Sequence, residues 1–455
     1  MKYVDPIGVM NQSASLTNNN LREESEEFKN SRKRVKTYYL FLTLFLFYLH
    51  FTHNILKYTI DSNKGEHMNN FDTVVNRVGS GSIKWDRRKE VFGNADVIPL
   101  WVADMDFTSP KEVLEALENR VKQGIFGYTD IGDDVYSSIM NWNKKRHHWN
   151  MTKEHIVFSN SVLSSLNIML RLLTKEKDKV LMLTPIYYPF SNIVNTLKRV
   201  SVYSKMEVNN YHYEINFDDL EKQMIEHKPK VMIFCNPHNP GGRVWDKEEL
   251  VKIINLCKKY NISIISDDIH KDIVFPGYTY TPMVTLCESY KENIYTLTSP
   301  TKIFNIAGIK SSYVVIYNER MKKLYELEAT RMTTSSLNVF AIEATKAAYT
   351  YCEYWVDELN SYLYKSYKII QEGLKDTRFH CFVSEGTYLL WVDYSSFNIS
   401  SDEMKSILIE HGLGMQMGEQ FGEAGRNYFR FNIGTQYAVL EKVIQTLQEI
   451  DQKIK

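Results

Sequence analysis

Short apolar runs alternate with segments of helical period through the middle of the chain, from about residue 125 to residue 350. Several runs are uninterrupted, as at residues 180–183 and 231–235. An uninterrupted apolar strand is buried on both faces, whereas an alternating strand is buried on only one. The pattern therefore predicts a mostly parallel sheet covered by helices on both sides. The strands we expect lie at residues 156–158, 179–183, 230–235, 261–266, 294–297 and 313–316.

The chain of 455 residues is too long for one small core, which favours two domains. After about residue 350 the pattern becomes that of a smaller α/β unit. It has expected helices at residues 354–374 and 438–454, and expected strands at residues 388–392 and 428–434. We expect a large domain at residues 118–349, and a small domain that combines residues 69–117 with residues 350–455.

Charge and cysteine content argue against several classes of function. The 55 basic residues balance the 55 acidic residues, and the body has no basic tract, so we expect no nucleic-acid partner. The five cysteines are scattered, odd in number and without CxxC spacing, which argues against a disulfide framework and a zinc site. Free thiols are typical of a reducing compartment, so we expect no metal and a cytoplasmic location.

Two explanations fit the first 67 residues. Residues 1–36 are polar and rich in Asn, a composition typical of disorder, whereas residues 37–56 contain no Lys, Arg, Asp or Glu. As a helix, residues 37–56 would span about 30 Å, the thickness of a bilayer core. The first explanation is therefore a transmembrane anchor. Basic residues before it would keep the N-terminus in the cytoplasm: Arg32, Lys33, Arg34 and Lys36.

The second explanation is a mis-assigned start. The body begins naturally at Met68, and Lys64-Gly65-Glu66 just upstream can be encoded by a purine-rich sequence that resembles a bacterial ribosome-binding site. We favour this explanation, with residues 1–67 as an untranslated upstream sequence. A membrane-anchored protein is the alternative, and it requires that residues 1–67 be made.

Three polar motifs follow three of the expected strands. Residues 236–242 read Asn-Pro-His-Asn-Pro-Gly-Gly, residues 266–270 read Ser-Asp-Asp-Ile-His, and residues 299–305 read Ser-Pro-Thr-Lys-Ile-Phe-Asn. Asn-Pro-Gly-Gly is typical of a turn. Parallel sheets bind ligands beyond the carboxyl ends of their strands. The motifs therefore predict a site at that edge, with an amide, a carboxylate and an amine.

In this order the motifs resemble those of the class I/II aminotransferase superfamily, which has pyridoxal-phosphate fold type I. The resemblance runs from about Asn69 to the C-terminus. Residues 101–107, 124–128 and 266–270 resemble more narrowly the cystathionine β-lyase branch of C–S lyases. The resemblance implies pyridoxal 5′-phosphate as cofactor, a large domain with a mostly parallel seven-stranded sheet between helices, and a smaller α/β domain. It also implies a homodimer with shared active sites.

The resemblance assigns five residues to the cofactor ring. Lys302 is similar to the lysine that binds the aldehyde as an imine and then removes the Cα proton, which requires a neutral amine. Asp267 resembles the carboxylate that keeps the ring nitrogen protonated. Asn239 and His270 resemble donors to the phenolic oxygen, although many relatives have Tyr at the position of His270. Tyr187 resembles the aromatic residue that stacks on the ring.

Further residues resemble the groups that bind phosphate and substrate. Arg430 is similar to the arginine that binds the substrate α-carboxylate through a bidentate pair. Many aminotransferases have Arg at the position of Lys310, so its phosphate contact is less well matched. The implied phosphate-binding residues are Ser161, Val162 and Leu163 in a loop before a helix, Ser299, Thr301 and Lys310, and Tyr128 from the neighbouring subunit.

The resemblance implies an enzyme that eliminates a sulfur leaving group from Cβ of an L-amino acid. The expected substrate is L-cystathionine or a related cysteine S-conjugate, and the products are a thiol, pyruvate and ammonia. An aminotransferase shares every one of these residues and stays open as the first alternative. A non-catalytic pyridoxal-phosphate-binding regulator is a remote second alternative.

Overall fold

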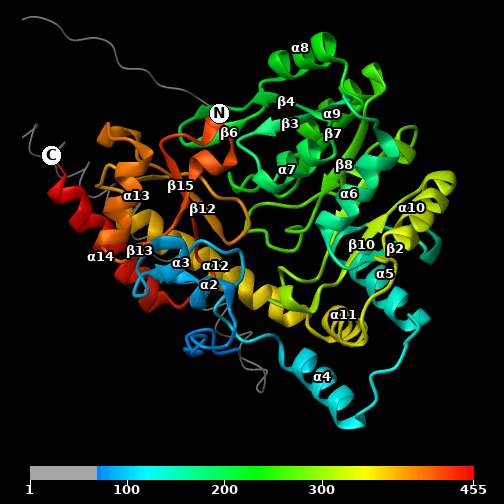
Figure 1. Cartoon of the computed structure of the whole chain (residues 1–455), viewed down its shortest axis with the longest axis horizontal. Coiled ribbons are helices and arrows are strands. Elements are labelled where there is room, and N and C mark those ends of the chain that lie inside the picture. Colours follow the sequence, from blue (N-terminus) through cyan, green and yellow to red (C-terminus); the bar gives the residue numbers. More distant parts are fainter. Residues whose placement is uncertain (1–68, 455) are drawn as a thin grey trace, which may run out of the picture. The chain divides into compact units, whose positions relative to one another are not determined.

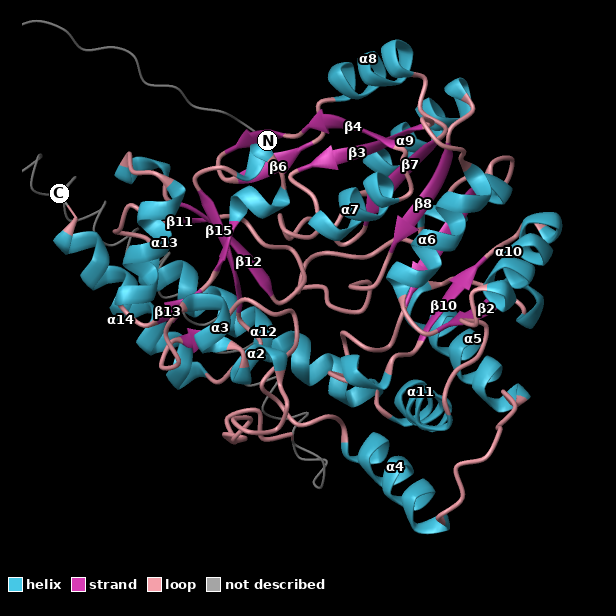
Figure 2. Ribbon diagram, viewed as in Figure 1, coloured by secondary structure: helices cyan, strands magenta, loops and turns pink. Residues whose placement is uncertain are grey.

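A seven-stranded sheet forms the centre of the structure (Figures 1 and 2). The computed structural model describes residues 69–454. Neighbouring strands are parallel except at β10, which is antiparallel to both β9 and β2. The predicted mostly parallel sheet of seven strands is confirmed. The strand order is β2 (Ile156–Ser159), β10 (Ser312–Val315), β9 (Ile294–Thr298), β8 (Ser263–Asp267), β7 (Val231–Cys235), β3 (Lys179–Thr184) and β4 (Val200–Lys205).

Strand β4 is the one strand of this sheet that our sequence analysis did not identify. It lies at the edge, and its residues alternate between exposed and buried positions. Polar residues such as Ser201, Ser204 and Lys205 interrupt its apolar character. An edge strand needs no continuous apolar run, because one of its faces remains accessible to water.

Helices pack on both faces of the sheet, and alternate residues of each strand belong to two separate apolar clusters. In β3, Leu181 packs in one cluster with residues of α9, whereas Val180 and Met182 pack in the other with residues of α6 and α7. This burial of both faces explains the uninterrupted apolar runs. The helices of this region are α5 (Asp133–His147), α6 (Val162–Leu173), α7 (Tyr188–Thr196), α8 (Phe217–His227), α9 (Lys247–Tyr260), α10 (Glu319–Arg331) and α11 (Val339–Tyr351).

Local signals set the ends of α9 and thereby the start of β8. Asp246 caps the helix by accepting from the backbone N–H of Glu249, whose side chain bonds back to the Asp246 N–H. This reciprocal pair satisfies N–H groups that have no partner within the helix. The helix ends at Asn261, which has a left-handed φ of 55°. The chain can then turn directly into β8, which ends at Asp267.

A second, four-stranded antiparallel sheet is built from the C-terminal part of the chain. Its order is β11 (His380–Cys381), β12 (Leu389–Asp393), β15 (Tyr428–Asn432) and β14 (Gln416–Met417). Helices α12 (Glu353–Leu374), α13 (Ser401–Glu410) and α14 (Tyr437–Lys453) accompany it. Strand β1 (Ile98–Pro99) pairs in parallel with β13 (Leu413–Gly414), which brings an N-terminal segment beside the C-terminal part (Figure 1). The predicted domain boundaries near residues 117 and 349 stay a prediction.

The remaining elements are short or peripheral. Helices α2 (Ile83–Asp86) and α3 (Arg88–Phe92) precede β1, α4 (Lys111–Gln123) precedes an exposed loop at residues 124–130, and β5 (Glu207–Asn209) forms a hairpin with β6 (His212–Glu214). Between residues 69 and 454, no helix is both long enough and apolar enough to cross a membrane. The candidate anchor at residues 37–56 and the proposed start at Met68 lie outside the described residues.

Candidate active site

The three polar motifs meet at the carboxyl edge of the central sheet. Asn236 follows β7, Asp267 ends β8, and Ser299 follows β9. Because β10 runs in the opposite direction, the residues before it lie at this same edge. A cavity of about 410 Å³ opens here. Its lining includes Lys302, Asp267, Asn239, His270, Tyr187, Ser161, Val162, Leu163, Ser299, Thr301 and Lys310.

Lys302 reaches a backbone carbonyl of a distant segment. Its Nζ donates to the carbonyl oxygen of Ala103 at 2.6 Å, and the hydroxyl of Tyr388 donates to the same oxygen at 3.0 Å. Lys302 lines the cavity as a partly buried residue, and the surrounding protein desolvates its amine. Burial lowers the pKa of Lys302 to about 8, and the nearby Arg430 acts in the same direction. A substantial fraction of this amine is therefore neutral near physiological pH.

Asp267 is a buried carboxyl group in the cavity lining. One of its oxygens accepts from the backbone N–H of Ile269 at 3.2 Å. Burial raises the pKa of Asp267 to about 7, and the adjacent Asp268 adds to this effect. The Asp268 carboxyl faces away into a separate network, where it accepts from Ser266 at 2.5 Å and from the hydroxyl of Tyr280. A cationic partner in the cavity would therefore stabilise the charged form of Asp267, which burial disfavours.

Arg430 is bonded to the lining residue Asn239, although it is not itself part of the cavity lining. Its Nη1 donates to Asn239 Oδ1 at 2.9 Å, and its Nη2 donates to the Trp101 carbonyl at 3.1 Å and to Gln416 Oε1. The guanidinium also stacks over Phe421, 4.9 Å from the ring centre. Burial lowers the pKa of Arg430 to about 10, so it remains a cation at neutral pH.

Two buried nitrogen atoms beside the cavity have no hydrogen-bond partner among the described residues. They are Nδ1 of His270 and Nε of Arg430. Buried polar groups are normally paired, and an unpaired one indicates a missing ligand or water. Burial lowers the pKa of His270 to about 3, and the charges of Lys302 and Arg430 reinforce this. His270 is therefore a neutral imidazole over the whole physiological range.

The N-terminus of α6 supplies backbone donors at the cavity wall. Ser161 caps the helix, and its Oγ accepts from the Ser164 backbone N–H at 3.1 Å. Val162 and Leu163 carry the first N–H groups of the helix, which have no intrahelical acceptor. The positive end of the helix dipole points in the same direction. This arrangement suits an anion such as a phosphate group.

The hydroxyls of Ser299 and Thr301 are already engaged with the protein. Ser299 Oγ donates to the Ser311 carbonyl at 2.5 Å, and it accepts from the Thr301 backbone N–H at 3.0 Å. The two hydroxyl oxygens lie 2.6 Å apart. A phosphate contact from Ser299 would therefore require its hydroxyl hydrogen to leave the Ser311 carbonyl. Lys310 is exposed and has a left-handed φ of 58°.

Tyr128 is a predicted site residue that the structure leaves outside this arrangement. It does not belong to the cavity lining, and its side chain is fully exposed in the loop after α4. Ile125 and Phe126 in the same loop are also exposed. The loop thus exposes apolar and aromatic side chains at the surface of the chain.

Sequence reasoning missed further residues at the site, among them four that hold Lys302 or Arg430 in place. The Ala103 carbonyl accepts from the Lys302 amine and from the Tyr388 hydroxyl, and Trp101 and Gln416 accept from Arg430. Residues 101–107 resembled the lyase branch, but a backbone carbonyl leaves no signal in the identity of its side chain. For Gln416 no local motif indicates the contact.

Comparisons with known proteins indicate the family of this chain. The family model for aminotransferase class I and II matches residues 95–447. The cystathionine β-lyase PatB of Bacillus subtilis strain 168 is 32% identical over 382 residues, which cover 83% of this chain and 99% of the relative.

Two solved structures are similar over most of the chain. Cystalysin from Treponema denticola, which contains a pyridoxal 5′-phosphate cofactor, has a TM-score of 0.81 at 29% identity and covers 84% of this chain and 100% of its own. The pyridoxal-phosphate-bound C–S lyase from Staphylococcus hominis has a TM-score of 0.79 at 32% identity, covering 85% of this chain and 98% of its own. The chain therefore belongs to the aminotransferase class I and II family, and its cofactor is pyridoxal 5′-phosphate.

Proposed function

We propose that the protein is a C–S lyase that breaks the Cβ–S bond of L-cystathionine or of a related cysteine S-conjugate. The observation that carries the chemistry is the meeting of Lys302 and Asp267 in one cavity, with Arg430 bonded to Asn239 at its side. The choice of elimination rests on the likeness to a cystathionine β-lyase and to C–S lyases.

The polar groups of the cavity suit the parts of pyridoxal phosphate. Lys302 would hold the aldehyde carbon, and the Asp267 carboxylate would pair with the ring nitrogen. Asn239 and the unpaired Nδ1 of His270 would bind the phenolic oxygen, and Tyr187 would cover a face of the ring. The phosphate would be held by the α6 N-terminus with Ser161, Val162 and Leu163, and by Ser299, Thr301 and Lys310.

The unpaired nitrogen of His270 supports this assignment most directly. Leaving a buried donor or acceptor without a partner costs about 1–3 kcal/mol, so a ligand that pairs with it would recover that energy. When bound, pyridoxal phosphate supplies an electron sink that stabilises negative charge at the substrate Cα.

Arg430 would bind the substrate α-carboxylate. Its Nε has no partner among the described residues, and burial strengthens its attraction for a carboxylate. Asn239, Trp101 and Gln416 hold the other side of the guanidinium in place. An arginine fixed in this way orients the substrate as well as binding it.

Lys302 would move the protons. With a pKa of about 8, its amine can be neutral near neutral pH and can accept the Cα proton. The Cβ–S bond then breaks, and the sulfur leaves with the bonding electrons as a thiolate, which takes a proton. Addition of water to the remaining three-carbon product gives pyruvate and ammonia, so that substrate and water balance thiol, pyruvate and ammonia.

A second subunit would complete the site. Tyr128 is fully exposed beside Ile125 and Phe126, and it lies outside the cavity of its own subunit. We infer that the protein is a homodimer in which this loop reaches the phosphate site of the partner. Amphipathic aromatic side chains are common at such interfaces.

The test of the lyase activity is pyruvate release from L-cystathionine without any added keto acid. We expect pyruvate and a thiol in equal amounts from the native protein. The Lys302→Ala variant should release neither. Amino transfer that depends on a keto acid, with no pyruvate from cystathionine, would instead make the protein an aminotransferase.

A further inference from the structure

Backbone carbonyls of residues 101–104 bind side chains on both sides of the proposed reaction site. The Trp101 carbonyl accepts from Arg430, and the Ala103 carbonyl accepts from Lys302. Asn432 Nδ2 donates to the carbonyls of the other two residues, Val102 at 2.8 Å and Asp104 at 2.5 Å. The position of this short segment therefore affects both the amine and the guanidinium.

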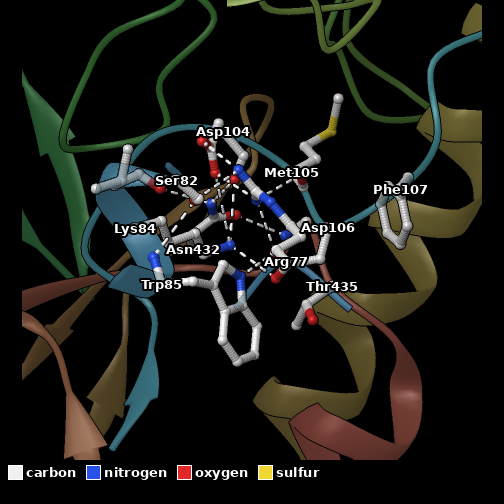
Figure 3. Close-up of polar contacts among 12 residues, drawn as sticks. Arg77, Ser82, Lys84, Trp85, Asp104, Met105, Asp106, Phe107, Asn432 and Thr435 are labelled. Atoms are coloured by element: carbon white, nitrogen blue, oxygen red, sulfur yellow. Dashed lines mark hydrogen bonds and ion pairs between the residues drawn. The ribbon is translucent and has the colours of Figure 1, made fainter. Parts of the chain in front are cut away.

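Four charged side chains anchor the segment, and we call them the Arg77 cluster: Arg77, Lys84, Asp104 and Asp106 (Figure 3). Arg77 binds Asp104 through two parallel hydrogen bonds, Nη1 to Oδ1 at 2.9 Å and Nη2 to Oδ2 at 2.8 Å. Its Nη1 also donates to Asp106 at 2.8 Å and to the Met105 carbonyl at 3.1 Å. Such a two-bond pair fixes direction as well as charge.

Lys84 and Asp106 form the buried half of the cluster. Lys84 Nζ lies 2.7 Å from Asp106 Oδ2, and the lysine side chain is fully buried. The indole N–H of Trp85 donates to the other Asp106 oxygen at 2.9 Å. Burial alone would raise the pKa of Asp106, but Lys84 and the other donors hold it below its ordinary value. The cluster thus pairs two carboxylates with two cations, so its formal charges balance.

Asp104 is the member of the cluster that acts on the reaction site. It directly follows Ala103, and its side chain keeps 23% of its surface exposed. Its negative charge raises the pKa of Lys302, opposing the effect of burial. Arg77 lies on both oxygens of this carboxylate and so counters its charge.

We propose that Arg77 is a positioning residue for the reaction. By binding Asp104 it holds in place the neighbouring Ala103 carbonyl, which accepts a hydrogen bond from the Lys302 amine. It also reduces the effect of the Asp104 negative charge on this amine. The inference rests on the proposed role of Lys302 and concerns the state of that amine rather than the identity of the substrate. The charged and titratable groups that face Lys302 are Asp104, Arg430, Asp267 and His270, while Tyr388 shares its carbonyl acceptor.

The test is a pH titration of the absorbance of bound pyridoxal phosphate, which reports the protonation of the nitrogen supplied by Lys302 and needs no substrate. Arg77→Gln removes the cation bonded to both oxygens of Asp104 and leaves only Lys84, 3.9 Å away, so the midpoint should rise by about 0.5–1 pH unit. Asp104→Asn removes the negative charge, so the midpoint should fall by about the same amount. The double variant should return close to the native midpoint, and Arg77→Lys, which keeps the charge, should lie between native and Arg77→Gln.

A matched control is Arg87→Gln. Arg87 forms an ion pair with Glu90, but the two side chains are 52% and 61% exposed, and the midpoint should not change. A purely structural role of Arg77 would shift Arg77→Gln and Asp104→Asn in the same direction or leave both midpoints unchanged, and either result overturns the proposal. If Arg77→Gln does not fold, the Asp104→Asn variant decides: a lower midpoint supports the proposal, and a higher or unchanged midpoint overturns it. Failure of the lyase proposal would show separately, as the expected midpoint shifts in a protein that releases no pyruvate from cystathionine.

Discussion

Burial acts in opposite directions on the two ionisable groups at the centre of the cavity. It lowers the pKa of Lys302 to about 8 and raises the pKa of Asp267 to about 7, because a low-dielectric surrounding disfavours charge of either sign. For the amine this shift provides a nucleophile near neutral pH. For the carboxyl it provides a group that a protonated ring nitrogen would bring back to its charged form.

The first prediction at the residue scale concerns pH. Cofactor-free protein should capture pyridoxal phosphate faster as pH rises, about tenfold per unit below pH 8 and with a plateau above, because only the neutral amine reacts. Stopped-flow absorbance between pH 6 and 9 measures this rate. The pKa of Asp267, about 7, lies in the same pH range. The Asp267→Asn variant is therefore the control, because its pH profile contains no contribution from that carboxyl group. A rate independent of pH would contradict the role of Lys302.

The second residue-scale prediction concerns the fork of Arg430. Arg430→Lys keeps the positive charge but loses the planar pair of donors, so kcat/KM for cystathionine should fall by about 30-fold, or about 2 kcal/mol. The absorbance of bound cofactor should remain native. Arg426→Lys is the matched control, because Arg426 precedes the same strand and its side chain is 65% exposed. An unchanged kcat/KM for Arg430→Lys would remove Arg430 from the substrate site.

At the scale of single elements, helix α6 combines a structural cap with a proposed anion site. Ser161 supplies the capping oxygen, and the N–H groups that follow it line the cavity. The same residue type caps α13, where Ser400 accepts from the Glu403 N–H at 3.2 Å. Ser400 does not belong to the cavity lining. Comparing substitutions of Ser161 and Ser400 therefore distinguishes an effect on helix stability from an effect on cofactor binding.

Ser161→Ala and Ser400→Ala should each lower the free energy of unfolding by about 1 kcal/mol. Urea denaturation of the cofactor-free proteins measures this change. Only Ser161→Ala should also weaken pyridoxal-phosphate binding, by about tenfold, because it removes a group beside the phosphate. Equal cofactor affinity in the two variants would argue that α6 does not face the phosphate.

At the scale of the whole molecule, Tyr128 makes the assembly testable. In a homodimer with shared sites, a Lys302→Ala subunit still has a native Tyr128. That Tyr128 can complete the site of a partner subunit that carries Tyr128→Ala and a native Lys302. Each mixed dimer then contains one native site. Co-expression of the two impaired variants should restore about a quarter of native pyruvate release, since half of the dimers are mixed and half of their sites are complete.

The same mixture has a clear opposite outcome. If Tyr128 acts within its own subunit, or not at all in the site, the mixed dimers contain no newly completed site and activity does not exceed that of the separate variants. Sedimentation of the native protein as a monomer would contradict the dimer as well.

The sequence by itself determined the type of sheet, because that depends on a local pattern, and its polar motifs predicted where residues would gather around a cavity. Uninterrupted apolar runs are required where helices cover both faces, and polar motifs directly after those runs must lie at one edge of a parallel sheet. Strand β4 was not predicted because its residues alternate between exposed and buried positions, a pattern that many surface segments share.

Only the tertiary structure decided which distant groups touch. Lys302 meets the Ala103 carbonyl across 199 residues of sequence, and Arg430 meets Asn239 across 191. These contacts, like the binding of Asp104 by Arg77, depend on how two sheets and an N-terminal segment pack together. Backbone carbonyls have no sequence signature and charged side chains have many potential partners, so local chemistry fixes the groups that are available while packing selects the pairs that form.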